Sequence, residues 1–195
     1  MNKTISLNRD NTFFTSDWHF GDKNIIKNCN RPFSDIDEMH AALIDIWNAK
    51  VSDNSTVVNM GDFAFWGPSK FGELGNVLTQ LKGNMLFVPG NHDRLNLWYN
   101  TLDAFPELKD KVRILPPVAD FRVGKQHIVG CHYAMMIWNK QHYGAWHLYG
   151  HSHDMHLTGI GLSMNVCIDA HPDFDLFTYE EIEEKISKLE IFRPF

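Results

Sequence analysis

The chain has 195 residues, of which 44% are hydrophobic and 22% charged, and its formal net charge is −6. This composition fits a globular protein rather than a disordered one, and the length suits one domain, residues 1–195, with a sizeable core. The negative charge argues against a broad surface for duplex DNA or an anionic membrane, but it permits a small phosphorylated ligand bound by local positive charge.

The cysteines and the N-terminal segment bear on the cellular compartment of the protein. Cys29, Cys131 and Cys167 lie far apart and form no CxxC pair, whereas disulfide scaffolds usually show even counts and short spacings. Residues 1–14 lack the apolar stretch of a signal peptide, and no run approaches the roughly 18 apolar residues that cross a bilayer. We therefore expect a cytoplasmic protein with no membrane association.

The first half of the chain predicts strands that alternate with helices. Strands are expected at residues 12–16, 56–60 and 85–88, because these runs are apolar or β-branched. Two helices separate them, one over residues 35–50 capped by Ser34, and one from Pro68 to Gly83. This alternation is typical of a parallel sheet, in which ligands bind beyond the carboxyl ends of the strands. We therefore expect one edge to gather Asp17, His19, Asp62, Asn91 and His92.

The second half of the chain predicts a different arrangement. Residues 119–123 and 126–131 flank a two-residue turn and resemble a β-hairpin. Residues 147–149 and 163–168 are two further strands, and a capping box at Thr178 and Glu181 begins a last helix. A second sheet packed on the first, with helices outside, accounts for both halves. The predicted fold is α/β, a four-layer α/β/β/α sandwich of two mixed sheets, with an irregular loop at 134–146 beside the site.

Five short motifs carry the chemistry, in the order DWH, GD, GNHD, an isolated histidine and GHSH. They offer oxygen and nitrogen donors that suit two adjacent transition-metal ions sharing one carboxylate. The spacing within DWH and GHSH predicts an extended backbone that points both ligands of each pair the same way. The expected ligands are Asp17, His19, Asp62, Asn91, His132, His151 and His153.

The charge of such a centre favours a phosphate ester. Two divalent ions carry four positive charges, of which Asp17, Asp62 and a bridging hydroxide together remove three, so the site stays positive. A metal pair also lowers the pKa of bound water to about 7. The expected reaction is therefore in-line attack of a metal-bridging hydroxide on phosphorus, with no covalent intermediate.

Residues beside the ligands are candidates for catalysis and substrate binding. His92 is expected to stabilise the transferring phosphoryl group or to protonate the leaving oxygen. Asp93 either orients neighbouring groups or caps a helix over residues 94–105. Arg31 and Arg94 are either phosphate clamps or solvated surface residues.

Other candidates precede the last motif. His142 and His147 are either substrate contacts or ordinary surface and core imidazoles. Trp138 and Trp146 either stack a ring of the substrate or pack under the loop. Cys131, next to His132 on a strand, points to the opposite face and is expected in the core.

The ordered motifs resemble those of the calcineurin-like metallophosphoesterase superfamily, namely DxH, GD, GNH(D/E), H and GHxH. Residues 15–21, 28–33 and 142–153 are similar to a group of small, single-domain bacterial and phage phosphoesterases. The resemblance implies an α/β/β/α sandwich and a catalytic role for His92 and Asp62. It implies two divalent ions, with manganese favoured over iron, zinc or nickel. One ion would be held by Asp17, His19, Asp62 and His153, and the other by Asp62, Asn91, His132 and His151.

Two departures narrow the expected activity. Protein phosphatases of the superfamily carry GDxxDRG, whereas residues 61–67 read GDFAFWG, so protein phosphatase activity is disfavoured. The DNA-end nucleases of the superfamily carry a capping domain and a coiled-coil insertion, which do not fit in this length.

Three functions remain open at this point. The favoured one is hydrolysis of a small phosphate ester, a diester in preference to a monoester. The second is processing of nucleic acid, expected only at short or single-stranded ends, which Asn28, Arg31, Arg94 and the aromatic loop suggest. The third is a non-catalytic interaction module on the same fold, which the complete ligand set opposes. The oligomeric state is left open.

Overall fold

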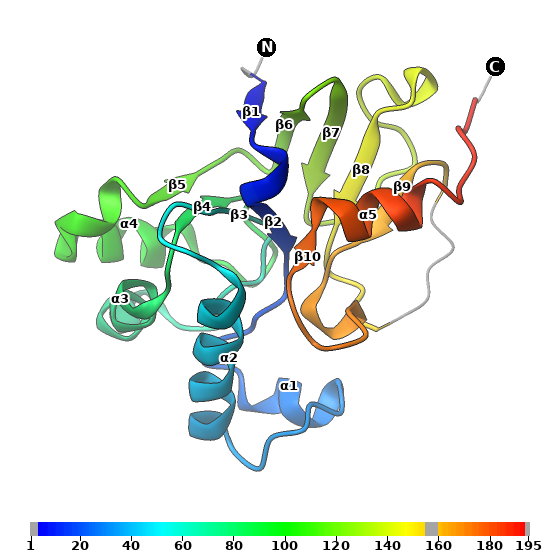
Figure 1. Cartoon of the computed structure of the whole chain (residues 1–195). Coiled ribbons are helices and arrows are strands. Elements are labelled where there is room, and N and C mark those ends of the chain that lie inside the picture. The colour runs from blue at the N-terminus through cyan, green and yellow to red at the C-terminus, as the bar shows by residue number, and fades with distance from the viewer. Residues whose placement is uncertain (1–3, 155–159, 194–195) are drawn as a thin grey trace.

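The computed structural model describes residues 4–154 and 160–193 (Figure 1). His156 and residues 1–3, 155–159 and 194–195 lie outside this range. The ten strands of the described residues form two five-stranded sheets, which confirms the predicted α/β sandwich of two mixed sheets. Within the described part of the chain, no helix combines the length and the apolar character needed to cross a membrane.

The first sheet carries the alternating half of the chain and has the order β10-β2-β3-β4-β5. Four strands run parallel, namely β2 (Thr12–Thr15), β3 (Thr56–Asn59), β4 (Asn84–Phe87) and β5 (Val112–Ile114). The edge strand β10 (Phe177–Thr178) is antiparallel to β2. The carboxyl ends of β2, β3 and β4 therefore lie side by side, as the alternation predicts.

The second sheet has the order β1-β6-β7-β8-β9. The predicted hairpin is confirmed, because β6 (Val118–Val123) pairs antiparallel with β7 (Gln126–Cys131). The strands β7, β8 (Trp146–Tyr149) and β9 (Ser163–Asn165) are parallel, and β1 (Ile5–Leu7) pairs parallel with β6. The residues that follow β7 and β8 consequently leave the sheet at the same edge.

In the described part of the chain, five α-helices lie around these sheets. They are α1 (Lys23–Asn28), α2 (Ile36–Lys50), α3 (Phe71–Gln80), α4 (Leu95–Ala104) and α5 (Tyr179–Ile186), with short 3-10 turns at Arg9–Asn11, Pro68–Lys70, Pro106–Lys109, Gln141–Tyr143 and Ile168–Ala170. Figure 1 shows α2, α3 and α4 together on one side of the molecule, while α5 lies close to β9 and β10. The predicted capping box of α5 is present, with reciprocal bonds between Thr178 and Glu181.

The core has two main parts on either face of the first sheet. Alternate residues of β3 illustrate the division, since strand neighbours point to opposite faces. Val57 packs with helix residues such as Trp47 and Leu78, whereas Val58 packs between the sheets with residues such as Phe121. The outer face of the second sheet is covered in part by a loop, because Val129 packs against Trp138. Trp138 thus packs under the loop, and Cys131 is buried as predicted.

Several predicted boundaries are wrong in detail. Asp35, not Ser34, caps α2, because its carboxylate accepts from the backbone N–H groups of Asp37 and Glu38, while the Ser34 hydroxyl bonds Glu38. The helix expected from Pro68 starts there only as a 3-10 turn, and α3 ends before Gly83. The strand expected over 163–168 ends at Asn165.

Candidate metal centre

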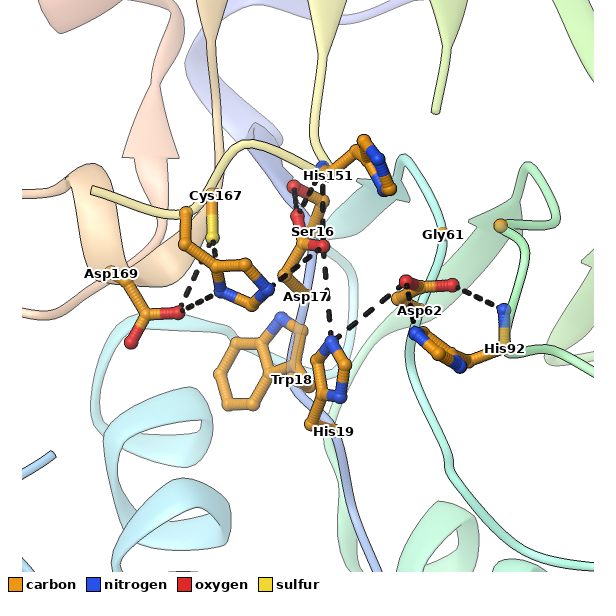
Figure 2. Close-up of polar contacts among 12 residues, drawn as sticks. Ser16, Asp17, Trp18, His19, Gly61, Asp62, His92, His151, Cys167 and Asp169 are labelled. Carbon is orange, nitrogen blue, oxygen red and sulfur yellow. Dashed lines mark hydrogen bonds and ion pairs between the residues drawn. The ribbon is translucent and has the colours of Figure 1, made fainter. Parts of the chain in front are cut away.

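The predicted ligands leave the two sheets at strand ends and meet between them. Asp17 and His19 follow β2, Asp62 follows β3, and Asn91 follows β4. From the second sheet, His132 follows β7, while His151 and His153 follow β8. Figure 2 shows the side chains of Asp17, His19 and Asp62 directed toward one another. Residues that are remote in the chain thus form one polar cluster at the edge of the sandwich.

The ligand atoms fall into two groups, each compact enough to hold one ion. The first is Asp17, His19 and His153, and the second is Asp62, His132 and His151; within each group the ligand atoms lie within 4.8 Å of one another. Beside the second group, the Oδ1 of Asn91 is 3.0 Å from the Nε2 of His132. Six of the seven predicted ligands therefore lie in these groups, and the seventh adjoins them.

Asp62 lies between the two groups. Its Oδ2 is 3.2 Å from the Nε2 of His132 and 3.8 Å from the Nε2 of His19. Burial acts to raise the pKa of the Asp62 carboxyl, but the contacts with His132, the backbone N–H of His92 and the charge of His19 together hold the pKa below its ordinary value. A charged carboxylate in this position has the geometry of a ligand shared by two ions.

The donor set fits a metal pair. The Nε2 of His19 is buried and has no hydrogen-bond partner, which is rare for a buried polar atom and expected for a free ligand nitrogen. The other ring nitrogen of three histidines faces an acceptor, as metal-bound imidazoles require. The Nδ1 atoms of His19, His132 and His153 lie 3.3, 2.8 and 2.7 Å from Asp22, the Met60 carbonyl and Asp169, respectively.

Five of the seven predicted ligands sit on left-handed backbone rather than on extended strands. Positive φ is uncommon outside glycine and costs about 1 kcal/mol or more per residue, so it is concentrated at functional sites. Hydrogen bonds from the backbone N–H groups of Asp17 and His19 to the carbonyls of Gly61 and Asp62 hold the first turn. The expectation of an extended backbone in DWH and GHSH is therefore wrong. The φ values are 61° at Asp17, 55° at His19, 51° at Asp62, 67° at His151 and 45° at His153.

Two glycines are required by the close approach of these turns. Gly61 has φ +98°, and a Cβ there would lie 2.8 Å from the Nδ1 of His132. A Cβ at Gly90 would lie 2.2 Å from Asp62 Oδ1. Real side chains do not tolerate such contacts with a fixed ligand, so the glycines of the GD and GNHD motifs allow the ligand loops to pack together.

Asp93 joins the GD and GNHD loops. Its buried carboxylate accepts hydrogen bonds from the backbone N–H groups of Asp62, Phe63, Ala64 and Gly90 at 2.6–3.3 Å. Burial raises the pKa of Asp93 to about 6, and the nearby Asp62 charge adds to the rise. Because α4 begins at Leu95 with no side-chain cap, the alternative of an Asp93 helix cap is wrong, and Asp93 orients its neighbours.

Comparison with known proteins agrees with this geometry. Residues 11–155 match the family described as calcineurin-like phosphoesterase. The chain belongs to this family. A stretch of 91 residues is 37% identical to the uncharacterized protein MJ1445 of Methanocaldococcus jannaschii, which covers 47% of this chain and 51% of that protein. The chain therefore spans about half the length of that relative.

One solved structure shows a similar fold. The crystal structure of AQ665 from Aquifex aeolicus, a protein of unknown function, is similar with a TM-score of 0.64 at 18% identity, covering 92% of this chain and 99% of that one. The phosphoesterase YfcE from E. coli has a TM-score of 0.45 at 14% identity, covering 80% of this chain and 78% of that one. The AQ665 likeness supports the sandwich fold of this family member.

Among the predicted substrate contacts, Arg31 has a side chain that bonds to other residues of the protein. Its side chain is 0% exposed and donates two hydrogen bonds of 2.8 Å to Asp169 and one each to the carbonyls of Asp17 and Trp18. The structure does not place this guanidinium as a clamp for a phosphate, because its donors are already engaged with the protein. Arg31 instead supports the loop that carries Asp17.

Of the three other predicted substrate contacts, one lies beside the candidate centre and two do not. His147 is fully buried, and its ring nitrogens contact the Val129 and Tyr133 carbonyls, so it supports the loop after β7 and does not face solvent. His142 lies before β8, at the end of that strand opposite His151, so it is not brought to the centre. Arg94 is exposed and lines a pocket together with His92, so both alternatives, a phosphate clamp and a solvated surface residue, stay predictions.

Two supporting acids were missed at the sequence level. Asp22 faces His19, and Asp169 faces His153 while also pairing with Arg31. Burial acts to raise the pKa of Asp169, but hydrogen bonds from His153 and Arg31 lower it to about 2. Asp169 directly follows the strand expected over 163–168, so the carboxyl-end rule applied to that strand would have found it. Asp22 has no comparable signal in the sequence.

Proposed function

We propose that this family member is a dinuclear-metal-dependent phosphodiesterase that acts on a small phosphate ester. The observation that carries the proposal is the position of Asp62 between two ligand groups, within 4 Å of a histidine from each. When bound, two divalent ions supply a hydroxide nucleophile near neutral pH and polarise the phosphoryl oxygens. Manganese is the favoured metal, with iron, zinc or nickel as alternatives.

His92 is the proposed catalytic group outside the ligand set. Its backbone N–H donates to Asp62 at 2.8 Å, and its Nε2 lies 3.9 Å from Asp62 Oδ2. Its side chain is 41% exposed, so an ester bound at the centre can reach the ring. The imidazole is thus placed to hold a phosphoryl oxygen or to give a proton to the leaving oxygen.

The space around His92 supports a diester. Two cavities of about 230 and 470 Å3 adjoin the centre, and His92 and Phe65 line both of them. A diester carries two organic groups on one phosphorus, and each needs room beside the reacting atom. A monoester would use one cavity.

The whole-chain charge limits the size of the substrate. A net charge of −6 repels a long polyanion, so nucleic acid is proposed as a substrate only at short or single-stranded ends.

We also propose a cytoplasmic location. Cys29, Cys131 and Cys167 are free thiols in the structure, which suits a reducing compartment.

The test compares bis(4-nitrophenyl) phosphate with 4-nitrophenyl phosphate in the presence of Mn²⁺. We expect the diester to be hydrolysed faster, chelation to abolish turnover, and Asp62→Asn to lower kcat/KM by at least about 100-fold, because it removes a charge that both ions require. Asp103→Asn, at an exposed position in α4, is the matched control and keeps wild-type turnover. Turnover that survives both chelation and Asp62→Asn would refute the proposal.

A further inference from the structure

Two cavities meet at a shared wall formed by Phe65 and His92. Their ring centroids are 4.9 Å apart in an edge contact, so the two side chains form one unit. The smaller cavity, of about 230 Å3, is also lined by Trp66, Gly67, Asn91 and Arg94. The larger, of about 470 Å3, extends past His19 and His153 to the acids Asp22 and Asp154. A substrate bound at the centre thus has two separate directions for its organic groups.

The two cavities differ in charge. Arg94 lines the smaller cavity, and no acidic residue is among the described residues of its wall. In residues 4–154 and 160–193, the Arg94 guanidinium has no ion pair or hydrogen bond, in contrast to the occupied guanidinium of Arg31. The larger cavity is lined by Asp22, whose carboxylate contacts His19 and the backbone N–H of Asn24, and by Asp154. A negatively charged group is therefore favoured beside Arg94 and disfavoured on the other side.

The smaller cavity also offers aromatic surface. Phe65 is 45% exposed although it is a large apolar side chain, and Trp66 forms the neighbouring wall. Flat rings of a ligand stack on such side chains, and this contact is tolerant of base identity. The cavity is smaller than the usual pocket for a complete drug-sized ligand, so it suits one part of a larger molecule.

We propose that the Arg94 cavity binds one arm of the diester, and that this arm is a phosphorylated nucleoside. The inference rests on the phosphodiesterase function proposed above and adds the class of substrate. The ring lies against Phe65, and the second phosphate pairs with Arg94, whose fork of N–H donors matches a phosphate. The larger, acidic cavity takes the arm without the extra charge.

Kinetics on three thymidine dinucleotides test the charge preference: one without a terminal phosphate, one with a 5′-phosphate and one with a 3′-phosphate. Wild-type protein with Mn²⁺ is expected to prefer one phosphorylated form over the unphosphorylated one by about tenfold in kcat/KM, the size of one charge-assisted contact. Arg94→Gln is expected to remove the preference. Arg122→Gln retains it, because Arg122 is exposed near the hairpin end of β6, away from the centre.

A binding measurement separates this inference from the proposed function. Calorimetric titration of the full chain without metal, using thymidine 3′,5′-bisphosphate as the probe, does not depend on turnover. We expect Arg94→Gln to weaken binding by about tenfold and Phe65→Leu by at least about fivefold, while Arg122→Gln has no effect.

The outcomes are distinct. Hydrolysis of bis(4-nitrophenyl) phosphate with equal rates on all three dinucleotides overturns the inference and leaves the phosphodiesterase function standing. Equal binding of the bisphosphate by wild type and Arg94→Gln also overturns it. Loss of bisphosphate affinity in Arg94→Gln, in a protein that cleaves no diester, supports the nucleotide site and counts against the catalytic proposal.

Discussion

The guanidinium of Arg31 shows how one buried residue connects the ligand loops. It links Asp169, which holds the ring of His153, to the carbonyl of Asp17. A sequence pattern identifies an arginine near the site, but burial decides whether its donors face a substrate or the protein. This is why the sequence predicted which motif residues would lie together, while the internal role of Arg31 and the supporting acids required the structure.

Removal of the Arg31 charge is expected to destabilise the protein and loosen the centre. Arg31→Gln leaves Asp169 buried without its main ionic partner, which costs about 3 kcal/mol when one member of a buried pair is lost. The looser His153 is expected to weaken metal affinity by about tenfold or more. Urea denaturation and metal titration measure the two effects.

A matched control separates burial from charge. Arg9→Gln removes an equally charged side chain whose contacts with Glu180 and Glu183 are exposed, and it is expected to cost much less stability than Arg31→Gln. In the double variant Arg31→Gln with Asp169→Asn, part of the loss is recovered, because no carboxylate remains unpaired. Wild-type stability in Arg31→Gln combined with weaker substrate binding would instead support the original interpretation of a phosphate clamp.

At the residue scale, the left-handed backbone conformation of the predicted ligands could not be predicted from the sequence. The period of a strand correctly places Asp17 and His19 at the end of β2, but the turn into left-handed φ depends on hydrogen bonds to the Gly61 loop. Those partners are over 40 residues away in the chain, so local propensity carries no information about them. Asp93 likewise serves loops that become adjacent only in the folded protein.

At the element scale, the long and periodic segments were predicted and the short ones were missed. The helix over residues 35–50 and the hairpin have clear patterns. The strands β1, β5 and β10 have two or three residues each, and they exist because a neighbouring strand offers hydrogen bonds. The six-residue helix α1 is similarly too short for a periodic signal.

The capping box of α5 predicts a pH dependence of stability. Burial acts to raise the pKa of Glu181, but hydrogen bonds from Thr178 and the charge of Lys50 outweigh it and lower the pKa below its ordinary value. A lowered pKa means that the charged form stabilises the fold above the ordinary pKa. This contribution is lost as the pH falls through the folded pKa.

Two substitutions of Glu181 separate the stabilisation by its hydrogen bonds to Thr178 from the stabilisation by its charge. Glu181→Ala removes both and is expected to cost about 1 kcal/mol near pH 7, whereas Glu181→Gln keeps an acceptor for Thr178 and costs less. Both variants are expected to lose less stability than wild type between pH 7 and pH 4, as measured by urea denaturation. The exposed Glu107→Gln is the control and keeps the wild-type dependence. A wild-type acid dependence in Glu181→Gln would contradict this account.

At the scale of the whole molecule, the centre joins the two sheets. The first sheet contributes Asp17, His19 and Asp62, and the second contributes His132 and His151. The carboxyl-end rule predicted this convergence within the first sheet. Convergence of the two sheets followed from the ordered motifs and their family resemblance, since periodicity alone does not specify how one sheet packs on another.

A centre shared by two sheets makes metal binding a contribution to global stability. An ion that binds only the folded chain stabilises it by about 2.7 kcal/mol at 100 times its Kd. For a protein of this length, that corresponds to a rise in Tm of about 5–10 °C. Thermal unfolding with and without Mn²⁺ is expected to show this shift, and Asp62→Asn is expected to lose most of it because both ligand groups depend on this carboxylate. Asp103→Asn keeps the full shift, whereas an equal shift in Asp62→Asn would place the stabilising ion elsewhere on the molecule.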